Sequence, residues 1–291
     1  MRADHAQLLG DRYRLISPLG QGGMGIVWRA HDRRLARDVA IKELRPARQD
    51  EEFDVRTARR HALREARSAA RLSHPAIVTV HDLLEEDGRL WIVMELVEAL
   101  TLQATAWHLG RLPVHWTAWI GFHLLSGLRH AHAAGVLHRD IKPGNVLLTG
   151  ERVVLSDFGI AVLQGEPTHH NTMPIVGSPG YIAPERMRGH PATQAADLWS
   201  FGATLYFSVE GRPPVTGGDI LTDTPDEARP SHRAGALRGL LEGLLHADPA
   251  ERLTSDQAAV LLSDILRKEG IAVPPMRLTG SGLFPPGAFT M

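Results

Sequence analysis

The stretch HRDIKPGN, His138–Asn145, places charged and strongly polar side chains between two apolar segments. The apolar, helix-like run WIGFHLLSGLRHAHAAG (residues 119–135) precedes it, and VLL (residues 146–148) follows it. Loops carry function because rigid elements position them, and polar groups set between apolar elements are costly unless a partner satisfies them. The stretch therefore predicts a loop that acts on a charged or polar ligand.

A second polar loop, LSDFG, places Asp157 shortly afterwards. The segment VLLTGERVVLSD between the two loops predicts a strand pair that turns at Gly150 and returns Asp157 to the neighbourhood of Asn145. Carboxylate and amide oxygens suit Mg²⁺, which proteins hold with few side chains together with substrate phosphates. Asp140 would then accept a proton from a hydroxyl group. A nucleotide-bound metal, a phosphate and a substrate hydroxyl would satisfy both loops.

The segment LGQGGMGIV sets Gly20, Gly22 and Gly25 in a G-x-G-x-x-G spacing. Such glycines let backbone amides approach phosphate closely. A dinucleotide-binding motif has this spacing where a helix begins, but Ile26 and Val27 favour a strand. We interpret the segment as a hairpin that lies over phosphates, and an ordinary glycine-rich turn is the alternative.

The segment VAIK ends on Lys42. Strand alternation puts Ala40 and Lys42 on one face of a sheet, where the ammonium group could hold nucleotide phosphates as a point charge. It would need an acidic partner, and Glu65 in an Arg- and Ala-rich helical segment is the candidate. The alternatives are a solvated strand end for Lys42 and a surface glutamate paired with nearby arginines for Glu65.

Composition narrows the classes of protein. The 291 residues are 43% hydrophobic and carry a formal net charge of −1, which gives no reason to expect a nucleic-acid partner. The absence of cysteine excludes disulfides, thiolate nucleophiles and zinc–thiolate sites. No apolar run approaches the roughly 18–20 residues of a spanning helix, and no secretory signal is visible. We expect a soluble, cytoplasmic protein without a membrane span.

The order of the segments predicts an α+β fold. Short stretches rich in β-branched and aromatic residues predict strands from Tyr13 to about Val97, with one helical interruption. Helices dominate from about Leu102 onward, broken by the strand pair described above. A small strand-rich part would thus precede a larger helical part. The Pro- and Gly-rich residues 268–291 are expected to be extended or disordered.

Several histidines invite comparison with a metal site. His130, His132 and His138 lie close in sequence, and His169 is followed by His170. Neither cysteines nor carboxylates at a matching spacing accompany them, so we expect no zinc site.

The joint spacing H-R-D-x-x-x-x-N followed by D-F-G resembles a protein kinase domain. More narrowly, the chain resembles the bacterial eukaryote-type (Hanks-type) serine/threonine protein kinases. The resemblance implies a bilobal fold over residues 11–267, with an N-lobe at 11–97 and a C-lobe at 98–267, an N-terminal extension at 1–10 and a tail at 268–291. It also implies ATP and Mg²⁺ as cofactors and protein serine or threonine hydroxyls as acceptors.

By the same resemblance, Asp140 would orient and deprotonate the attacking hydroxyl, and Lys142 would offset charge on the transferring phosphoryl group. Asn145 and Asp157 would bind the metal ions. Glu65 would be the ion-pair partner of the lysine that holds the α- and β-phosphates. The residues implied to contact ATP are Gly20, Gly22, Gly25, Val27, Ala40, Lys42, Met94, Glu95, Val97 and Leu147.

Away from the ligands, the resemblance implies three buried arrangements. Asp197 would brace the backbone of the catalytic loop. Glu185 and Arg252 would form a buried ion pair. His138 and Phe158 would belong to an apolar stack that aligns the active state.

The segment between Gly159 and Pro184 resembles an activation loop. We expect Thr172 or Thr168 to be autophosphorylated, with a transient homodimer serving that reaction. Ser178 matches a hydroxyl that contacts the catalytic aspartate.

One region departs from the family. The stretch that follows Val215 is shorter than in the family and lacks the pattern of the further helix that often docks substrates there. The mode of substrate docking is therefore not implied by the resemblance. A nucleotide-binding pseudokinase or signalling scaffold is the main alternative function, and a small-molecule phosphotransferase is the third.

Overall fold

The computed structural model describes most of the chain and divides it into two compact units. The first unit lies within residues 8–73 and 78–98, and the second comprises residues 74–77, 99–158 and the described residues from 179 to 272. The described ranges are 8–22, 25–44, 63–64, 66–158, 179–215, 228–229 and 231–272.

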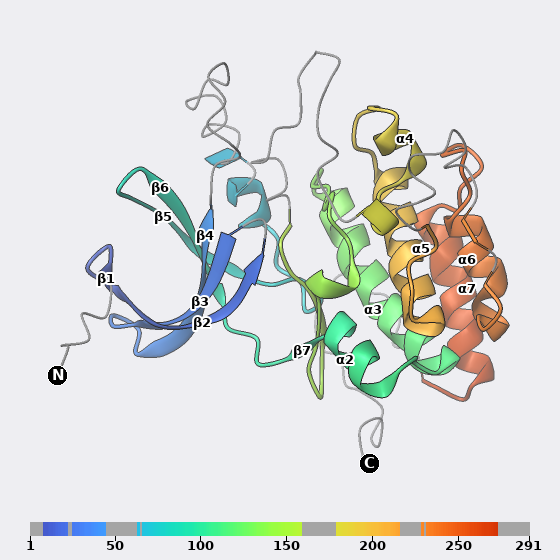
Figure 1. The fold of residues 1–291 in the computed structure, drawn as a ribbon, viewed down its shortest axis with the longest axis horizontal. Helices are drawn as coiled ribbons and strands as arrows, with labels where there is room; N and C mark the ends of the chain where they lie inside the picture. The colour runs from blue at the N-terminus through green and yellow to red at the C-terminus, as the bar shows by residue number, and fades with distance from the viewer. Residues whose placement is uncertain are drawn as a thin grey trace. The chain divides into compact units, whose positions relative to one another are not determined.

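The first unit is built on a six-stranded sheet whose neighbouring strands are all antiparallel (Figure 1). The strand order is β1-β2-β3-β4-β6-β5. Asp87 and Gly88 both have positive φ angles, so the hairpin between β5 and β6 turns in two residues with the geometry that matches strand twist. The strands are β1 (Leu8–Leu9), β2 (Tyr13–Gly22), β3 (Gly25–Asp32), β4 (Arg37–Leu44), β5 (Val80–Glu86) and β6 (Arg89–Glu95).

The two faces of this sheet have different roles. Val39 and Ile41 of β4 belong to a buried cluster on one face with residues of β1, β2, β3 and β6. Alternate residues of β4 point to the other face, where Leu44 packs with Ala66 of the helical segment described at 63–64 and 66–69. The apolar cluster covers the face that holds Val39 and Ile41. The side chains of alternate β4 residues therefore point away from this cluster.

Helices make up most of the second unit, with one small three-stranded sheet of order β7-β8-β9 (Figure 1). The helices are α2 (Leu102–Leu109), α3 (Val114–Ala133), α4 (Pro184–Met187), α5 (Gln194–Glu210), α6 (Arg238–Leu244) and α7 (Ser255–Lys268). The strands are β7 (Leu100–Thr101), β8 (Val146–Leu148) and β9 (Val153–Leu155), and the 3-10 turns are η1 (Pro143–Asn145), η3 (Pro179–Tyr181) and η4 (Gly235–Leu237).

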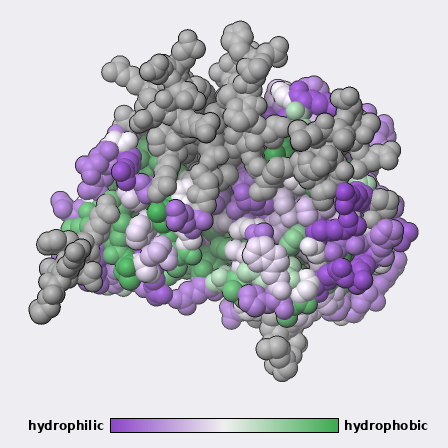
Figure 2. Space-filling view, viewed as in Figure 1, coloured by the Kyte–Doolittle hydropathy of each residue, from purple (hydrophilic) through white to green (hydrophobic). Residues whose placement is uncertain are grey.

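The long helix α3 packs against α5 and α7. Gly121 permits this approach, because a Cβ atom at that position would lie 3.0 Å from Leu205 and 3.4 Å from Leu262. Helix α5 is buried from Ala196 to Glu210, whereas α7 buries only one side. The surface at the right of Figure 2, over the last helices, is accordingly hydrophilic.

These elements confirm the α+β fold and the order of strand-rich and helical parts. The strand pair expected around Gly150 is present as β8 and β9. Most of the helix expected around Glu65, the activation segment, residues 216–227 and the tail beyond Ala272 lie outside the described residues. Among the described helices, none is both long and apolar enough to cross a bilayer.

The expected ion pair between Glu185 and Arg252 is confirmed. Arg252 donates from Nη1 to Oε1 of Glu185 at 2.7 Å and from Nη2 to Oε2 at 3.0 Å, and both side chains are buried. Its Nη1 also donates to the carbonyl of Ala195 at 2.7 Å. The pair therefore joins α4 to the start of α5 and to the loop before α7.

Removing one half of this pair should destabilise the protein, because the remaining charge stays buried without its partner. We expect Glu185→Ala and Arg252→Ala each to lower the free energy of unfolding by about 3–5 kcal/mol, as measured by denaturant unfolding. The double variant should lose less than the sum of the two single losses. A double-mutant cycle in which the losses simply add would contradict this account.

A cluster of histidines lies between α3 and residues 74–77. Nδ1 of His74 accepts the N–H of Ala76 at 3.1 Å, which leaves Nε2 to donate to Oγ of Ser126 at 3.2 Å. The ring of His130 lies 5.2 Å from that of His74. Burial, assisted by the neighbouring imidazole, lowers the pKa of both His74 and His123 to about 4. Both rings are therefore neutral in the folded protein at neutral pH.

This cluster predicts a loss of stability in acid. In the unfolded chain these histidines take up a proton near pH 6.5, but in the folded protein they do so only near pH 4. The free energy of unfolding is therefore unaffected by these histidines above pH 6.5 and falls as the pH is lowered toward 4. The loss is at most about 1.4 kcal/mol per pH unit for each histidine. Denaturant unfolding at several pH values should show a flatter profile for His74→Gln/His123→Gln. An unchanged slope would contradict the assignment.

Candidate active site

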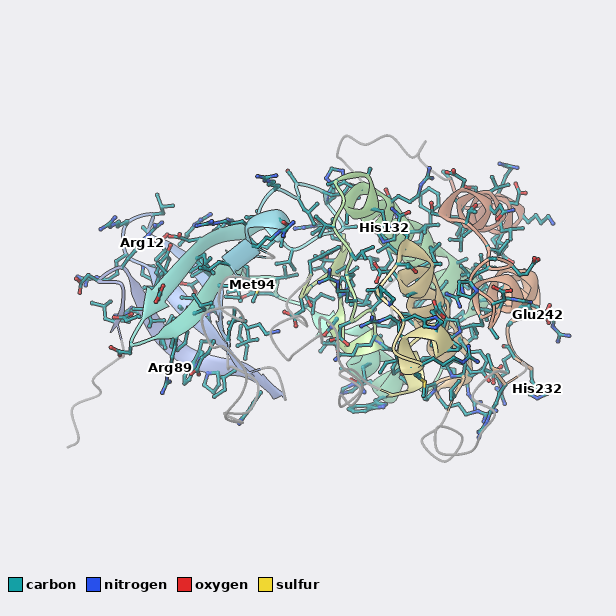
Figure 3. The ribbon with its side chains drawn as sticks, turned by 90° about the horizontal axis from the view of Figure 1, so that it is seen from above. Arg12, Arg89, Met94, His132, His232 and Glu242 are labelled. Atoms are coloured by element: carbon teal, nitrogen blue, oxygen red, sulfur yellow. The ribbon has the colours of Figure 1, made fainter. Side chains whose placement is uncertain are left out.

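One face of the first unit's sheet gathers several residues expected to bind a nucleotide. Gly20 on β2 is paired with Val27 on β3, which is paired in turn with Lys42 on β4. Ala40 lies two residues before Lys42 and is paired with Met94 on β6 (Figure 3). Directly paired residues share a face, as do alternate residues of a strand. The register therefore sets Val27, Ala40, Lys42 and Met94 on the face opposite the apolar cluster.

The glycine motif spans the β2–β3 hairpin. Gln21 is paired with Ile26, and Gly22 with Gly25, so the motif joins two strands rather than opening a helix. Gly25 has a φ angle of 131°, which favours glycine. The expected hairpin is therefore confirmed; residues 23–24 at its tip lie outside the described part of the chain.

Glu95 and Val97 follow at the end of β6. The backbone N–H of Glu95 donates to the carbonyl of Thr79 at 2.9 Å, and the carboxylate of Glu95 accepts the N–H of Thr79 at 2.9 Å. Val97 is half-buried in the segment after the strand. Glu65, the expected partner of Lys42, lies outside the described residues.

In the second unit, HRDIKPGN folds into a compact polar cluster ahead of β8. Nζ of Lys142 lies 2.8 Å from Oδ2 of Asp140. Nδ2 of Asn145 donates to the backbone carbonyl of Asp140 at 2.8 Å and to its Oδ2 at 3.0 Å. Both Asp140 and Asn145 are buried. Oδ2 of Asp140 is thus held by two donors. Leu147, expected to contact adenine, is half-buried on β8, where it is paired with Thr101 of β7 and Val154 of β9.

The β8–β9 pair brings the second polar loop back to the first. Ser156, directly after β9, donates from its backbone N–H to the carbonyl of Asn145 at 2.9 Å and from Oγ to the same carbonyl at 3.1 Å. Asp157 is the next residue, so the structure brings Asn145 and Asp157 into the same region, as the sequence predicts.

Two residues of these loops have backbone conformations that non-glycine residues rarely adopt. The φ angle is 69° at Arg139 and 65° at Asp157. Such conformations cost about 1–3 kcal/mol each and persist where the surroundings fix them. Arg139 directly precedes Asp140, and Asp157 is itself one of the expected metal ligands.

The donor atoms at this place fit a magnesium ion. Because Nδ2 of Asn145 faces Asp140, its Oδ1 is the atom that can turn toward a cation. Asp157 supplies carboxylate oxygens. Hard oxygen ligands from few side chains are what Mg²⁺ takes when substrate phosphates complete its shell.

Asp197, in the first turn of α5, accepts hydrogen bonds from the backbone of the HRDIKPGN loop. Its Oδ2 accepts the backbone N–H of His138 at 2.9 Å, and its Oδ1 accepts that of Arg139 at 2.8 Å. His132 lies on α3 (Figure 3). Its Nε2 lies 2.8 Å from Oδ2 of Asp197. The expected brace by Asp197 is confirmed, and His132 adds to it.

The ring of His138 connects the two loops. Its Nε2 donates to the carbonyl of Ser156 at 2.8 Å, and its Nδ1 accepts the N–H of Asp140 at 3.2 Å. Burial lowers the pKa of His138, which agrees with a neutral ring that donates from one nitrogen and accepts at the other. The ring of Phe158 lies 4.5 Å away, edge on, as the expected stack requires.

Sequence patterns do not assign all of these roles. They consider His130 and His132 only as members of a zinc site that is not expected, and they place His138 in an apolar stack through the family resemblance alone. In the structure each ring has a different partner: His130 lies beside His74, His132 beside Asp197, and His138 donates to Ser156. Sequence patterns give Ser156 no role at all. Its position immediately before Asp157 was the one available signal.

Comparison with known proteins agrees with this geometry. The family model described as the protein kinase domain matches residues 13–261. The chain is 38% identical over 260 residues to the serine/threonine-protein kinase PknA of Mycobacterium tuberculosis, covering 85% of this chain and 59% of that protein. It is 36% identical over 285 residues to PkaA of Streptomyces coelicolor, covering 91% and 51%.

The chain thus spans only part of the length of these relatives. Among solved structures, the kinase domain of M. tuberculosis PknI gives a TM-score of 0.73 at 29% identity, and the alignment covers 91% of this chain and 99% of that one. This confirms the expected protein kinase fold. The chain belongs to the protein kinase family, among the bacterial serine/threonine kinases of the Hanks type.

Proposed function

We propose that this domain is an ATP-dependent serine/threonine kinase that transfers the γ-phosphoryl group to a protein hydroxyl. The observation that carries the proposal is the cluster of the buried Asp140 and Asn145 with the half-buried Lys142, bonded through Ser156 to the segment that holds Asp157. A carboxylate, an ammonium group and oxygen ligands for a cation are the groups that phosphoryl transfer requires.

Asp140 would act on the acceptor. Lys142 and Asn145 hold its Oδ2, which fixes the orientation of the carboxylate. The acceptor hydroxyl would give its proton to this carboxylate as the oxygen attacks phosphorus and the bond to ADP breaks. Lys142 would offset the charge that the transferring group carries.

The metal would be held by Asn145 and Asp157. Mg²⁺ supplies charge neutralisation of the β- and γ-phosphates when it is bound. The two residues orient their oxygens, and the bonds from Ser156 keep their two segments together.

The residues proposed to hold the nucleotide come from several elements. Gly20, Gly22 and Gly25 would cover the phosphates, and Lys42, paired with Glu65, would hold the α- and β-phosphates. Adenine would lie against apolar side chains and hydrogen-bond to backbone groups near the end of β6. The residues proposed for adenine are Val27, Ala40, Met94, Glu95, Val97 and Leu147.

The wider assignments rest on the same resemblance. We propose a kinase domain at residues 11–267, divided near residues 97–98, with protein substrates and no nucleic-acid partner. A reaction that consumes ATP is suited to the cytoplasm. Thr172 and Thr168, which lie outside the described residues, would be autophosphorylated in a transient homodimer.

The function predicts phosphorylation that depends on Asp140. After treatment with Mg²⁺ and ATP, mass spectrometry of the parent protein should find phosphate on Thr172 or Thr168. Asp140→Asn should reduce the rate by about 10²- to 10⁴-fold, because the general base is lost, while nucleotide binding is retained in a thermal-shift assay. Asp264→Asn, the same change on an exposed residue of α7, should leave the rate unchanged.

Two results would contradict the proposal. A parent protein that binds nucleotide but phosphorylates neither itself nor a generic protein would support the scaffold alternative. Transfer to small alcohols but to no protein would support a small-molecule phosphotransferase.

A further inference from the structure

We propose that the Ser156 hydroxyl is a positioning group for the metal site: it fixes the peptide of Asn145 so that Asn145 and Asp157 act on one cation. This inference rests on the proposed function.

Ser156 makes three hydrogen bonds to the HRDIKPGN loop. The carbonyl of Asn145 accepts two of them, from the N–H at 2.9 Å and from Oγ at 3.1 Å. The carbonyl of Ser156 accepts a third, from Nε2 of His138 at 2.8 Å. Its peptide with the next residue leads directly into Asp157. The residue is therefore bonded to one proposed metal ligand and covalently joined to the other.

The bond from Oγ adds a constraint that the backbone bond lacks. A carbonyl with one donor can pivot about that contact, whereas two donors from different directions fix the plane of the Asn145 peptide. The side chain of Asn145 is fixed separately, by the two bonds from Nδ2 to Asp140. With peptide and amide both held, Oδ1 has one direction in which to face a cation.

Asp157 depends on the same constraint. Its φ angle of 65° is costly, and such conformations persist only where neighbouring bonds fix the backbone. Ser156, the residue before Asp157, supplies hydrogen bonds to Asn145 and accepts one from His138 on the N-terminal side of Asp157. Loss of the hydroxyl would let the Asn145 and Asp157 segments shift relative to each other. Metal affinity should fall, since ligand orientation by neighbouring hydrogen bonds tunes metal sites.

The same hairpin offers a matched control. Oγ1 of Thr149, at the turn between β8 and β9, accepts the N–H groups of Glu151 at 3.0 Å and Arg152 at 2.7 Å. Thr149→Val removes this hydroxyl and keeps the shape of the side chain. It should weaken the hairpin without touching Asn145. Thr149→Val and Ser156→Ala therefore separate a general loss of hairpin stability from a loss of metal positioning.

The test is Mn²⁺ binding in the presence of ADP, followed by the electron paramagnetic resonance signal of free Mn²⁺. No turnover is needed. Ser156→Ala should weaken Mn²⁺ binding by about threefold to tenfold, the range expected for one lost hydrogen bond. Ser156→Thr, which keeps the hydroxyl, should restore it, and Thr149→Val should stay within about twofold of the parent. Ser156→Cys, a weak donor of similar size, gives an intermediate value if the alanine variant does not fold.

The possible results are distinct. Equal Mn²⁺ affinity in the parent and Ser156→Ala, or an equal loss in Thr149→Val, overturns the positioning role and leaves the proposed kinase function standing. A parent protein that shows no Mn²⁺ binding with ADP overturns the proposed function and this inference together.

Discussion

The HRDIKPGN loop depends on the buried carboxylate of Asp197. A loop of polar residues cannot be held by apolar packing, and its backbone donors must find acceptors inside the protein. Asp197 supplies both of its oxygens to the N–H groups of His138 and Arg139, and His132 contacts one of them from α3. Since α5 is buried almost throughout, the carboxylate is as fixed as the core itself. The hydrogen bonds from His138 and Arg139 to Asp197 therefore fix the backbone of the loop relative to the apolar core.

The polar side chains of the candidate site also hold one another in place through hydrogen bonds and ionic contacts. Asp140 is held by Lys142 and Asn145, and Asn145 is held by Asp140 and Ser156. Each polar group satisfies a neighbour that would otherwise be buried without a partner. The strained backbone at Arg139 and Asp157 is affordable in this setting because both residues adjoin bonds that the fold has already fixed.

Much of this arrangement could be predicted from the sequence. The spacing of Asp140, Asn145 and Asp157 and the strand pair around Gly150 were enough to bring the three residues together, because a hairpin returns the chain to its starting point. Strand alternation alone set Ala40 and Lys42 on one face. The bonds of Ser156 and His132 were not predictable, since they join side chains to groups 11 and 65 residues away whose meeting depends on tertiary packing. No pattern signals a positive φ angle at an arginine or an aspartate.

The placement of residues 74–77 bears on how the protein can be divided. This segment lies between two parts of the first unit in sequence but folds with the second, where Ala76 accepts the N–H of Leu155 and Ile77 forms a bridge with the same residue. A fragment that ended near residue 98 would carry these four residues away from their partners and expose Ala76 and Ile77, which are now buried. A cut near residue 98 would thus leave the second unit without four of its residues. A fragment meant to fold as the second unit therefore needs residues 74–77 as well as the chain from residue 99 onward.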